Sequence, residues 1–499
     1  MLTVLWVLPA LGGLVGAAAG RRLSWLGPLA AAVALVLCLS LWGQAGHLVE
    51  TANWIGGPFT VSYRLGLSGL SLVLVAMTLL ITCVAGFAGR AHGPAFTAWM
   101  CALGAAATGL FLARNLVLFY IFWELTLIPA YFLLVGWGGP GRQAAAWRFL
   151  LYNIGGSVAL LLGIAALVAF GVHMPGLGAG LNAGLPAGLP AGLNPGLNPG
   201  GSLALTVPPA LVVPVGVALF IAFAVKTPLW PLHGWVADTY AELPAPAAAL
   251  VGGVQSKAGL YGMLALLIPL LPGAVRAWQP VFFAVAAVSL LYGAFCALAA
   301  KDPRRLIAYS SVSHLGLVML AFLTLQRQAL AGGVIQMIAH GIFTAALFLL
   351  VGMLERRMQG PVDLGKLGGL ARSAPALAGG LILMAMAALG LPGLAGFPGE
   401  LLMLVGIWHT NILLAVLGAI ALVVAAAYML RLVQLVLHGP RDGKGVDDLG
   451  AVERWLLAPL AVVLLLVGLW PQPIPRQAQA AVGAALAAAP ASTTAGGNG

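Results

Sequence analysis

The chain has 499 residues, of which 62% are hydrophobic and 7% charged, and its formal net charge is +11. Soluble proteins carry about 25% charged residues, and a soluble chain of this length could not bury so much apolar surface. The composition therefore excludes a soluble globular protein and predicts an all-α polytopic membrane protein. The basic residues stand at the ends of apolar runs and form no patch, so they indicate membrane topology and not nucleic-acid binding.

Apolar runs of about 18 residues or more, long enough to cross a bilayer, recur along the whole sequence. We predict fourteen spans, at residues 2–20, 23–43, 66–88, 94–113, 115–137, 146–171, 208–226, 244–271, 277–299, 305–325, 329–354, 375–407, 411–437 and 454–471. The first of them lacks the basic start of a signal peptide and is followed by Arg21 and Arg22. That order is typical of a first spanning helix.

Fourteen spans place both termini on one side of the membrane and sort the basic residues unequally. Sixteen lysines and arginines fall in the loops of one side, and five fall on the other side: Arg64, Arg114, Arg276, Arg327 and Arg476. Lys226 and Lys257 stay within the spans. Because cytoplasmic loops carry the excess of positive charge, the first side is predicted to be cytoplasmic and both termini external.

Six ionisable residues lie well inside the predicted spans: Glu124, Lys226, Lys257, His314, His340 and Glu400. A charge at a helix centre costs about 2.5–3.5 kcal/mol, so four formal charges cost on the order of 10 kcal/mol, comparable to the stability of a whole domain. Each position has a structural alternative: a glutamate pairing a lysine, a lysine reaching for the interface, or a hydrogen-bonded core histidine. Together the six favour a functional series.

Two proline- and glycine-rich stretches interrupt spans: KTPLWPLHGW (226–235) in the seventh and LGLPGLAGFPGE (389–400) in the twelfth. Broken helices at membrane depth are tolerated only inside protein or beside a water-filled cavity. The breaks are five helices apart, and each carries an ionisable group, Lys226 or Glu400. Spans 4–8 and 9–13 are therefore predicted to be inverted five-helix repeats, which are typical of transporters.

This pattern favours a conductor of protons or other cations. Burial favours the neutral form of a lysine and a nearby carboxylate favours its charged form. A carboxylate that approaches and leaves a lysine can therefore move a proton. We predict a relay that runs along the membrane through bridging water, in the order Glu124, Lys226, Lys257, the two histidines and Glu400.

The remaining segments complete the predicted domain organisation. Polar positions, a GGP turn and β-forming residues at 44–65 predict a short external hairpin, and the Gly-Leu-Pro/Asn repeats at 175–202 predict a flexible external linker. The units are N-terminal helices with the hairpin, a first repeat with the linker, a second repeat, a C-terminal helix and a disordered tail, at residues 1–90, 91–271, 272–438, 439–477 and 478–499.

The four cysteines, Cys38, Cys83, Cys101 and Cys296, are isolated within apolar runs, without a CxxC or Cys/His cluster. We interpret them as small core residues and predict no metal or iron–sulfur site in this chain. The glycine-rich stretch at 176–184 has no strand before it, so it does not indicate a dinucleotide site. Any redox chemistry is expected in other chains.

Several motifs resemble the antiporter-like membrane subunits of respiratory complex I, the NADH-quinone oxidoreductase. The resemblance covers residues from about 60 to 470, and its motifs are WELTLIPAYFLLVGWGG, KTPLWPLHGW, PAPAAALVGGVQSKAGLYGM, KDPRRLIAYSSVSHLGLVMLAF, QMIAHGIFTAALFLLVG and LPGLAGFPGE. The HGW after the first break, and a glutamate in place of a lysine at Glu400, favour the M-type subunits over the L and N types. Ala237 and Tyr240 depart from the family's proline and histidine.

The resemblance implies a proton-pumping module of the membrane arm, in a bacterial plasma membrane. It implies that Glu124 tunes Lys226, that Lys257 is the central lysine, that His314 and His340 are polar relay positions, and that Glu400 is the terminal relay acid. It also implies L-like and N-like antiporter-like neighbours, with the hairpin as a lateral tie. NADH, FMN, iron–sulfur clusters and quinone would be bound by partner subunits, and no cofactor by this chain.

Four alternatives stay open. A subunit of an Mrp-type sodium/proton antiporter shares the lysine pattern, and Glu400 and the HGW count against it. A structural membrane subunit that conducts nothing would tolerate neutral residues at Lys226 and Lys257. A solute carrier would need a polar substrate pocket, and a subunit of a membrane-bound hydrogenase complex is a further relative.

Overall fold

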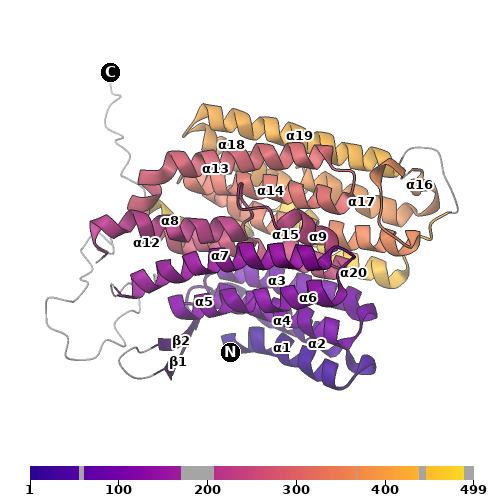
Figure 1. Ribbon diagram of the computed structural model, residues 1–499, viewed down its shortest axis with the longest axis horizontal. Coiled ribbons are helices and arrows are strands. Elements are labelled where there is room, and N and C mark those ends of the chain that lie inside the picture. The colour runs from indigo at the N-terminus through magenta and orange to yellow at the C-terminus, as the bar shows by residue number, and fades with distance from the viewer. Residues whose placement is uncertain (56–60, 170–206, 367, 438–444, 488–499) are drawn as a thin grey trace.

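The computed structural model describes residues 1–55, 61–169, 207–366, 368–437 and 445–487. Helices that run roughly side by side make up almost all of it, with one short β-hairpin at their ends (Figure 1). Within the described residues, twelve helices are long and apolar enough to cross a membrane, and three shorter apolar helices accompany them. The prediction of an all-α polytopic membrane fold is confirmed. The exact number of crossings and the inverted repeats stay predictions.

The first part of the chain, coloured indigo to magenta, forms the lower side of the bundle in Figure 1. Its helices are α1 (Leu2–Ala18), α2 (Leu26–Ser40), α3 (Gly69–Gly89), α4 (Pro94–Leu112), α5 (Leu116–Leu125), α6 (Leu127–Trp137), α7 (Arg142–Ala169), α8 (Pro209–Lys226) and α9 (Val236–Glu242). The fifth predicted span is thus two helices, α5 and α6, which meet at Thr126.

The second part packs beside it. Its helices are α10 (Ala245–Leu250), α11 (Lys257–Gly262), α12 (Ile268–Leu270), α13 (Pro272–Ala299), α14 (Pro303–Leu323), α15 (Arg327–Met358), α16 (Leu370–Ser373), α17 (Pro375–Ala388), α18 (Gly396–Trp408), α19 (Ile412–Leu437), α20 (Ala451–Leu469) and α21 (Pro473–Ala487). Two π-helical turns, Val251–Gln255 and Met263–Leu267, join α10, α11 and α12 into one continuous run. α14 and α15 are buried along almost their whole length and form the core.

The predicted hairpin is confirmed within the described residues. β1 (Val49–Ile55) and β2 (Val61–Gly66) pair antiparallel, with Val49 opposite Gly66. We call the end of the bundle that carries β1, β2 and Arg114 the hairpin side, and the end that carries Arg142 and Arg304 the arginine side. The predicted linker at 175–202 lies outside the described residues.

The prediction of a disordered tail from Ala478 is wrong for residues 478–487, which form the second half of α21. Its buried residues, Ile474, Ala478, Ala481, Val482 and Ala485, recur at helical spacing and form one apolar stripe. Alanine is the strongest helix former, so a composition that reads as low complexity here also favours a helix. Residues 488–499 lie outside the described part.

The loop before α20 caps the first half of the broken twelfth span. Asp448 accepts hydrogen bonds from the backbone N–H groups of Ala376 (3.1 Å) and Leu377 (3.0 Å) in the first turn of α17, and from its neighbour Leu449 (2.8 Å). Partial burial acts to raise the pKa of Asp448, but these donors outweigh it and hold that pKa below its ordinary value. The charged carboxylate therefore stabilises the start of α17.

We predict that Asp448→Ala lowers the free energy of unfolding by about 1 kcal/mol, the usual effect of losing a helix cap. Because the folded pKa is lowered, the stabilisation is complete above the ordinary value of about 3.9 and disappears as the pH falls through the folded value. Thermal unfolding of the purified protein at neutral and acidic pH measures this. An Asp448→Ala protein as stable as the native one at neutral pH would contradict the prediction.

Candidate functional site

Five of the six predicted relay residues are buried. Their exposed fractions are 1% for Lys226, 0% for Lys257, 1% for His314, 0% for His340 and 5% for Glu400. Glu124 is only partly buried. Lysine and glutamate are almost never fully buried unless they are paired, so what each of these side chains contacts decides what the site can do.

Lys257 is held by three oxygen or nitrogen atoms. Its Nζ lies 2.9 Å from the carbonyl oxygen of Gly252, 3.2 Å from the hydroxyl of Ser256 and 2.7 Å from Nδ1 of His340. The carbonyl belongs to the π-helical turn before α11, and such turns often mark functional sites. Because an ammonium group only donates hydrogen bonds, His340 accepts at Nδ1 when Lys257 is charged, and a proton can pass between them.

Two glycines bring these side chains together. A Cβ atom on Gly341 would lie 2.3 Å from Sδ of Met77 and 2.8 Å from the carbonyl oxygen of Gly253. A Cβ on Gly253 would lie 2.9 Å from the carbonyl oxygen of Gly341. Only glycine allows α15 and the π-helical turn to cross this closely, as small residues do at helix contacts in membranes. The crossing sets Lys257 opposite His340.

The rings of the two histidines lie edge to face and share no hydrogen bond. The ring centroids of His314 and His340 are 5.8 Å apart, and Phe343 lies against both rings. Both nitrogens of His314 are buried and have no hydrogen-bond partner among the described residues. Nε2 of His340 lies 3.4 Å from the hydroxyl of Thr344. Unpaired buried nitrogens of this kind are what a bridging water would satisfy.

Lys226 ends α8 at the first break. Its Nζ donates to the hydroxyl of Thr126 (2.9 Å) and lies 4.9 Å from the ring centre of Trp123. In the described ranges no carboxylate lies within 4.0 Å of it, and one carboxylate oxygen of Glu124 is buried without a partner. The structure thus shows Glu124 and Lys226 apart, with Lys226 held by a neutral hydroxyl.

The break after Lys226 is held by its own hydrogen bonds. The N–H of Leu229 donates to the carbonyl of Ala224 (2.8 Å), and the indole of Trp235 donates to the carbonyl of Val225 (3.1 Å). Lys226 therefore sits at a satisfied helix C-terminus, where the helix dipole favours a positive charge.

α8 and α11 meet directly between the two lysines. A Cβ on Gly259 would lie 2.2 Å from the hydroxyl oxygen of Thr227, so the end of α8 packs tightly against α11. Thr227 follows Lys226, and Gly259 lies two residues after Lys257. The close approach places the first break beside the central lysine.

Glu400 lies just after the second break, on α18. Its carboxylate accepts from Nε2 of Gln336 at 3.2 Å. Gln336 precedes His340 by one turn of α15, so it faces the same way. Gly390, with φ of +76°, gives the carboxylate room, since a Cβ there would lie 2.1 Å from its Oε2. The break thus makes the space that Glu400 occupies.

Sequence reasoning missed the neutral partners of the charged groups: Thr126, Ser256, Gln336 and Thr344. A signal did exist for two of them, because Gln336 and Thr344 lie four residues before and after His340 in an otherwise apolar helix. Spacing of four residues places side chains on one helix face. For Thr126 and Ser256, no spacing distinguished them from ordinary helix residues.

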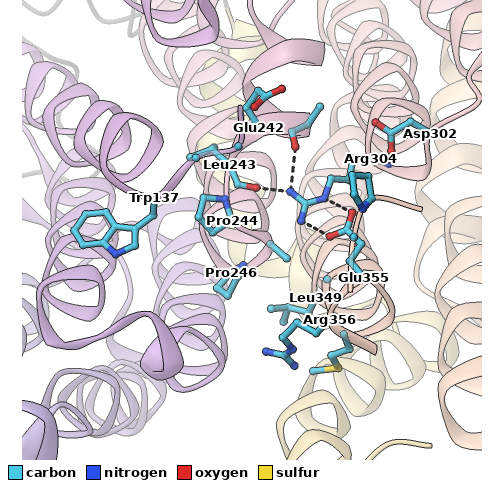
Figure 2. A pocket seen from close by; sticks show the side chains of 18 of the residues that line it. Trp137, Glu242, Leu243, Pro244, Pro246, Asp302, Arg304, Leu349, Glu355 and Arg356 are labelled. Atoms are coloured by element: carbon cyan, nitrogen blue, oxygen red, sulfur yellow. Dashed lines mark hydrogen bonds and ion pairs between the residues drawn. The ribbon is translucent and has the colours of Figure 1, made fainter. Parts of the chain in front are cut away.

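A separate pocket of about 510 Å³ opens on the arginine side. Figure 2 shows Arg304 crossing it to reach Glu355 and the carbonyl oxygens of Ala241 and Leu243. Below these charges the pocket is lined by apolar residues of α15, among them Leu349. Leu349 lies nine residues after His340 on α15, which is about 13 Å along the helix.

The described residues contain no group of three His, Cys, Asp or Glu side chains that could hold a metal ion. Cys38 and Cys101 are buried, Cys83 and Cys296 are partly buried, and all four are free thiols. The contacts of Lys257, His340 and Glu400 join groups that can take up and release protons.

Comparisons with known proteins show which family the chain belongs to. Residues 113–426 match the family model described as NADH:quinone oxidoreductase/Mrp antiporter, TM. NADH-quinone oxidoreductase subunit M of Rhodobacter capsulatus is 32% identical over 468 residues, covering 91% of this chain and 89% of that protein.

Two solved structures have similar folds. A chain of respiratory complex I from Thermus thermophilus is 31% identical, with a TM-score of 0.86 over 98% of this chain and 99% of that one. A chain of the Mrp complex from Dietzia is 24% identical, with a TM-score of 0.80 over 97% of this chain and 51% of that one, and shows the fold alone. The chain belongs to the NADH:quinone oxidoreductase/Mrp antiporter family of membrane subunits, among the relatives named subunit M.

Proposed function

We propose that this chain is a proton-translocating subunit in the membrane arm of NADH-quinone oxidoreductase. Its relay would consist of Glu124, Lys226, Lys257, His314, His340 and Glu400. The observation that carries the proposal is the 2.7 Å contact between Lys257 and His340, both fully buried. A buried amine beside a buried imidazole is costly for packing and is suited to passing a proton.

The pocket on the arginine side would be the cytoplasmic mouth of this relay. Between its floor and His340 lie Tyr240 and Phe348, whose ring centroids are 5.6 Å apart, and then Thr344. The hydroxyl of Tyr240 is buried and has no partner among the described residues. Water entering past Tyr240 would reach Thr344 and deliver a proton to His340.

The first half of the relay would be a switch. Lys226 donates its hydrogen bond to Thr126, and Glu124, two residues before Thr126, has a carboxylate oxygen without a partner among the described residues. Approach of Glu124 would favour the charged form of Lys226, and its departure would favour release of the proton towards Lys257. The contact between Thr227 and Gly259 holds together the two helices that carry these lysines.

The second half would lead outward. From His340 the proton would pass Gln336, which is bonded to Glu400, and leave on the hairpin side. Under this proposal the arginine side faces the cytoplasm of a bacterium and both termini face outside, following the excess of basic residues. L-like and N-like chains would flank this one, and NADH, FMN, iron–sulfur clusters and quinone would be bound by partner subunits.

The test is Lys226→Ala in membrane vesicles, with assembly checked on a native gel. We expect NADH oxidation and the proton gradient to drop together in an assembled complex, because the switch would lack its ammonium. Lys301→Ala, which removes an exposed lysine of the arginine side, is the matched control. Normal pumping by the assembled Lys226→Ala complex would overturn the proposal.

The same experiment addresses the alternative function. The fold is shared with a chain of an Mrp complex, so a sodium/proton antiporter subunit is the second candidate. If Lys226→Ala leaves NADH-driven pumping untouched and abolishes sodium tolerance of the cells, that candidate replaces the first.

A further inference from the structure

One charged side chain near the relay has no part in it. Arg114 lies between α4 and α5 on the hairpin side, and its guanidinium donates to the hydroxyl of Tyr261 (2.9 Å), the hydroxyl of Ser71 (3.1 Å) and the carbonyl of Ala113 (3.0 Å). It is only partly exposed. The guanidinium therefore ties together the ends of three helices, α3, α4 and α11.

The surrounding backbone is shaped around this arginine. The N–H of Arg114 donates to the carbonyl of Arg64 in β2 (2.9 Å). A Cβ on Gly66, at the end of β2, would lie 2.8 Å from Cγ of Arg114 and 3.1 Å from its Nε. The hairpin thus covers the side chain and leaves it little freedom to move.

The charge of Arg114 has no counter-charge in the described ranges. No carboxylate there lies within 4.0 Å of its guanidinium, whereas Arg304, Arg305, Arg356, Arg357 and Arg454 on the arginine side all have one. A guanidinium keeps its proton at every physiological pH. A fixed and unpaired positive charge therefore stands at the hairpin end of α11.

Tyr261 connects this charge to the central lysine. It lies one turn of α11 beyond Lys257, on the same face, and is 1% exposed. Its hydroxyl donates to the carbonyl of Phe111 (3.1 Å) while it accepts from Arg114, so both of its roles are occupied. The rings of Phe111 and Phe119 pack on it, at centroid distances of 5.3 and 6.4 Å.

The surroundings of Lys257 thus differ on its two sides, with polar partners towards the arginine side and apolar rings towards the hairpin side. Towards the arginine side it has the Gly252 carbonyl, Ser256 and His340. Towards the hairpin side, one turn further along α11, stands the ring of Tyr261 packed by Phe111 and Phe119, and beyond it the guanidinium of Arg114. Arginines placed in this way exclude protons and other cations from membrane pores.

We propose that Arg114, held by Tyr261, is an electrostatic block that prevents protons from passing directly between Lys257 and the hairpin side. This inference rests on the proposed relay and adds to it a reason for sideways transfer. If Lys257 could exchange protons with both sides at once, the gradient would drain through it. The block leaves His340 and the second half of the chain as the outlet.

The test measures passive proton entry into liposomes that contain the purified complex, without NADH, under an imposed potential. We expect Arg114→Met to raise the rate about tenfold, the effect of removing one unit charge roughly 10 Å away in a partly polar interior. Arg114→Lys, which keeps the charge, should stay near the native rate. Arg276→Met, which removes an exposed arginine of the same side, should also stay native.

A second variant shows which route the leak takes. Adding Lys257→Met to Arg114→Met should return the leak to the native rate, because the proton would have no amine to use. A persistent leak in that double variant, or an equal leak in Arg114→Lys, would overturn the block and assign Arg114 to structure. A leak-free Arg114→Met complex also overturns the block alone, whereas normal pumping by Lys226→Ala overturns the relay.

Discussion

Replacing Lys257 by methionine should lower NADH-driven proton translocation on the order of a hundredfold, the usual loss when a positioned proton-transfer group is removed. Methionine fills a similar volume and removes the free-energy cost of burying an amine, which offsets the hydrogen bonds lost to the Gly252 carbonyl and to His340. The complex should therefore assemble. Nδ1 of His340 would lose its partner at 2.7 Å, and the connection between the two halves of the chain would be cut.

The measurement records NADH oxidation and the fluorescence of a pH-sensitive dye in the same vesicles. Lys301→Met serves as the matched control, since Lys301 is exposed. Because electron transfer and pumping are coupled in the proposed function, both signals should fall together. A fully assembled Lys257→Met complex that pumps at the native rate would show that this lysine has a structural role only.

Replacing Gly341 by leucine should destabilise the protein by about 3 kcal/mol, the upper end of the usual cost of overpacking. Even the first carbon of the new side chain would lie 2.3 Å from Met77 and 2.8 Å from the carbonyl of Gly253. α15 would have to move away from the π-helical turn. His340 would move with it, so pumping should be lost in whatever fraction of the complex still assembles.

Gly379→Leu is the matched control for this substitution. Gly379 lies on α17 with nothing within 4 Å of the position of a Cβ, and it is exposed. The Gly379→Leu variant should have the same thermal stability and the same rate of proton pumping as the native protein. Equal thermal stability of Gly341→Leu and Gly379→Leu would contradict a tight crossing of α15 and the π-helical turn at Gly253.

The site residues that could be predicted are those that stand out from their own neighbours in the sequence. Lys226 and Glu400 stand out in the sequence because each adjoins both an apolar run and a stretch rich in proline and glycine. The helices are interrupted at these stretches, at 227–235 and 389–395. The burial of Lys257 follows from its place in the middle of an apolar run. The free-energy cost of placing a charge inside a membrane identifies such residues in the sequence even when their partners are unknown.

The partners themselves could not be predicted. Lys257 and His340 are 83 residues apart, and what brings them together is the crossing of two helices at Gly253 and Gly341, which no periodicity reports. The π-helical turn that frees the Gly252 carbonyl is likewise not predicted by any pattern in the sequence. α21 shows the opposite error, since its alanine-rich composition hid a regular apolar stripe.

The measurement that tests the central claim most directly compares Lys226→Ala, Lys257→Met and Glu400→Gln in one series. The rate of NADH-driven proton translocation is recorded for each assembled complex, with Lys301→Met as the control. Residues that act as one unit lose function together and not in proportion to their number. If the three form a single relay, all three rates fall to the same low level while the control stays native. An assembled complex of any of the three that still pumps at the native rate would contradict the relay.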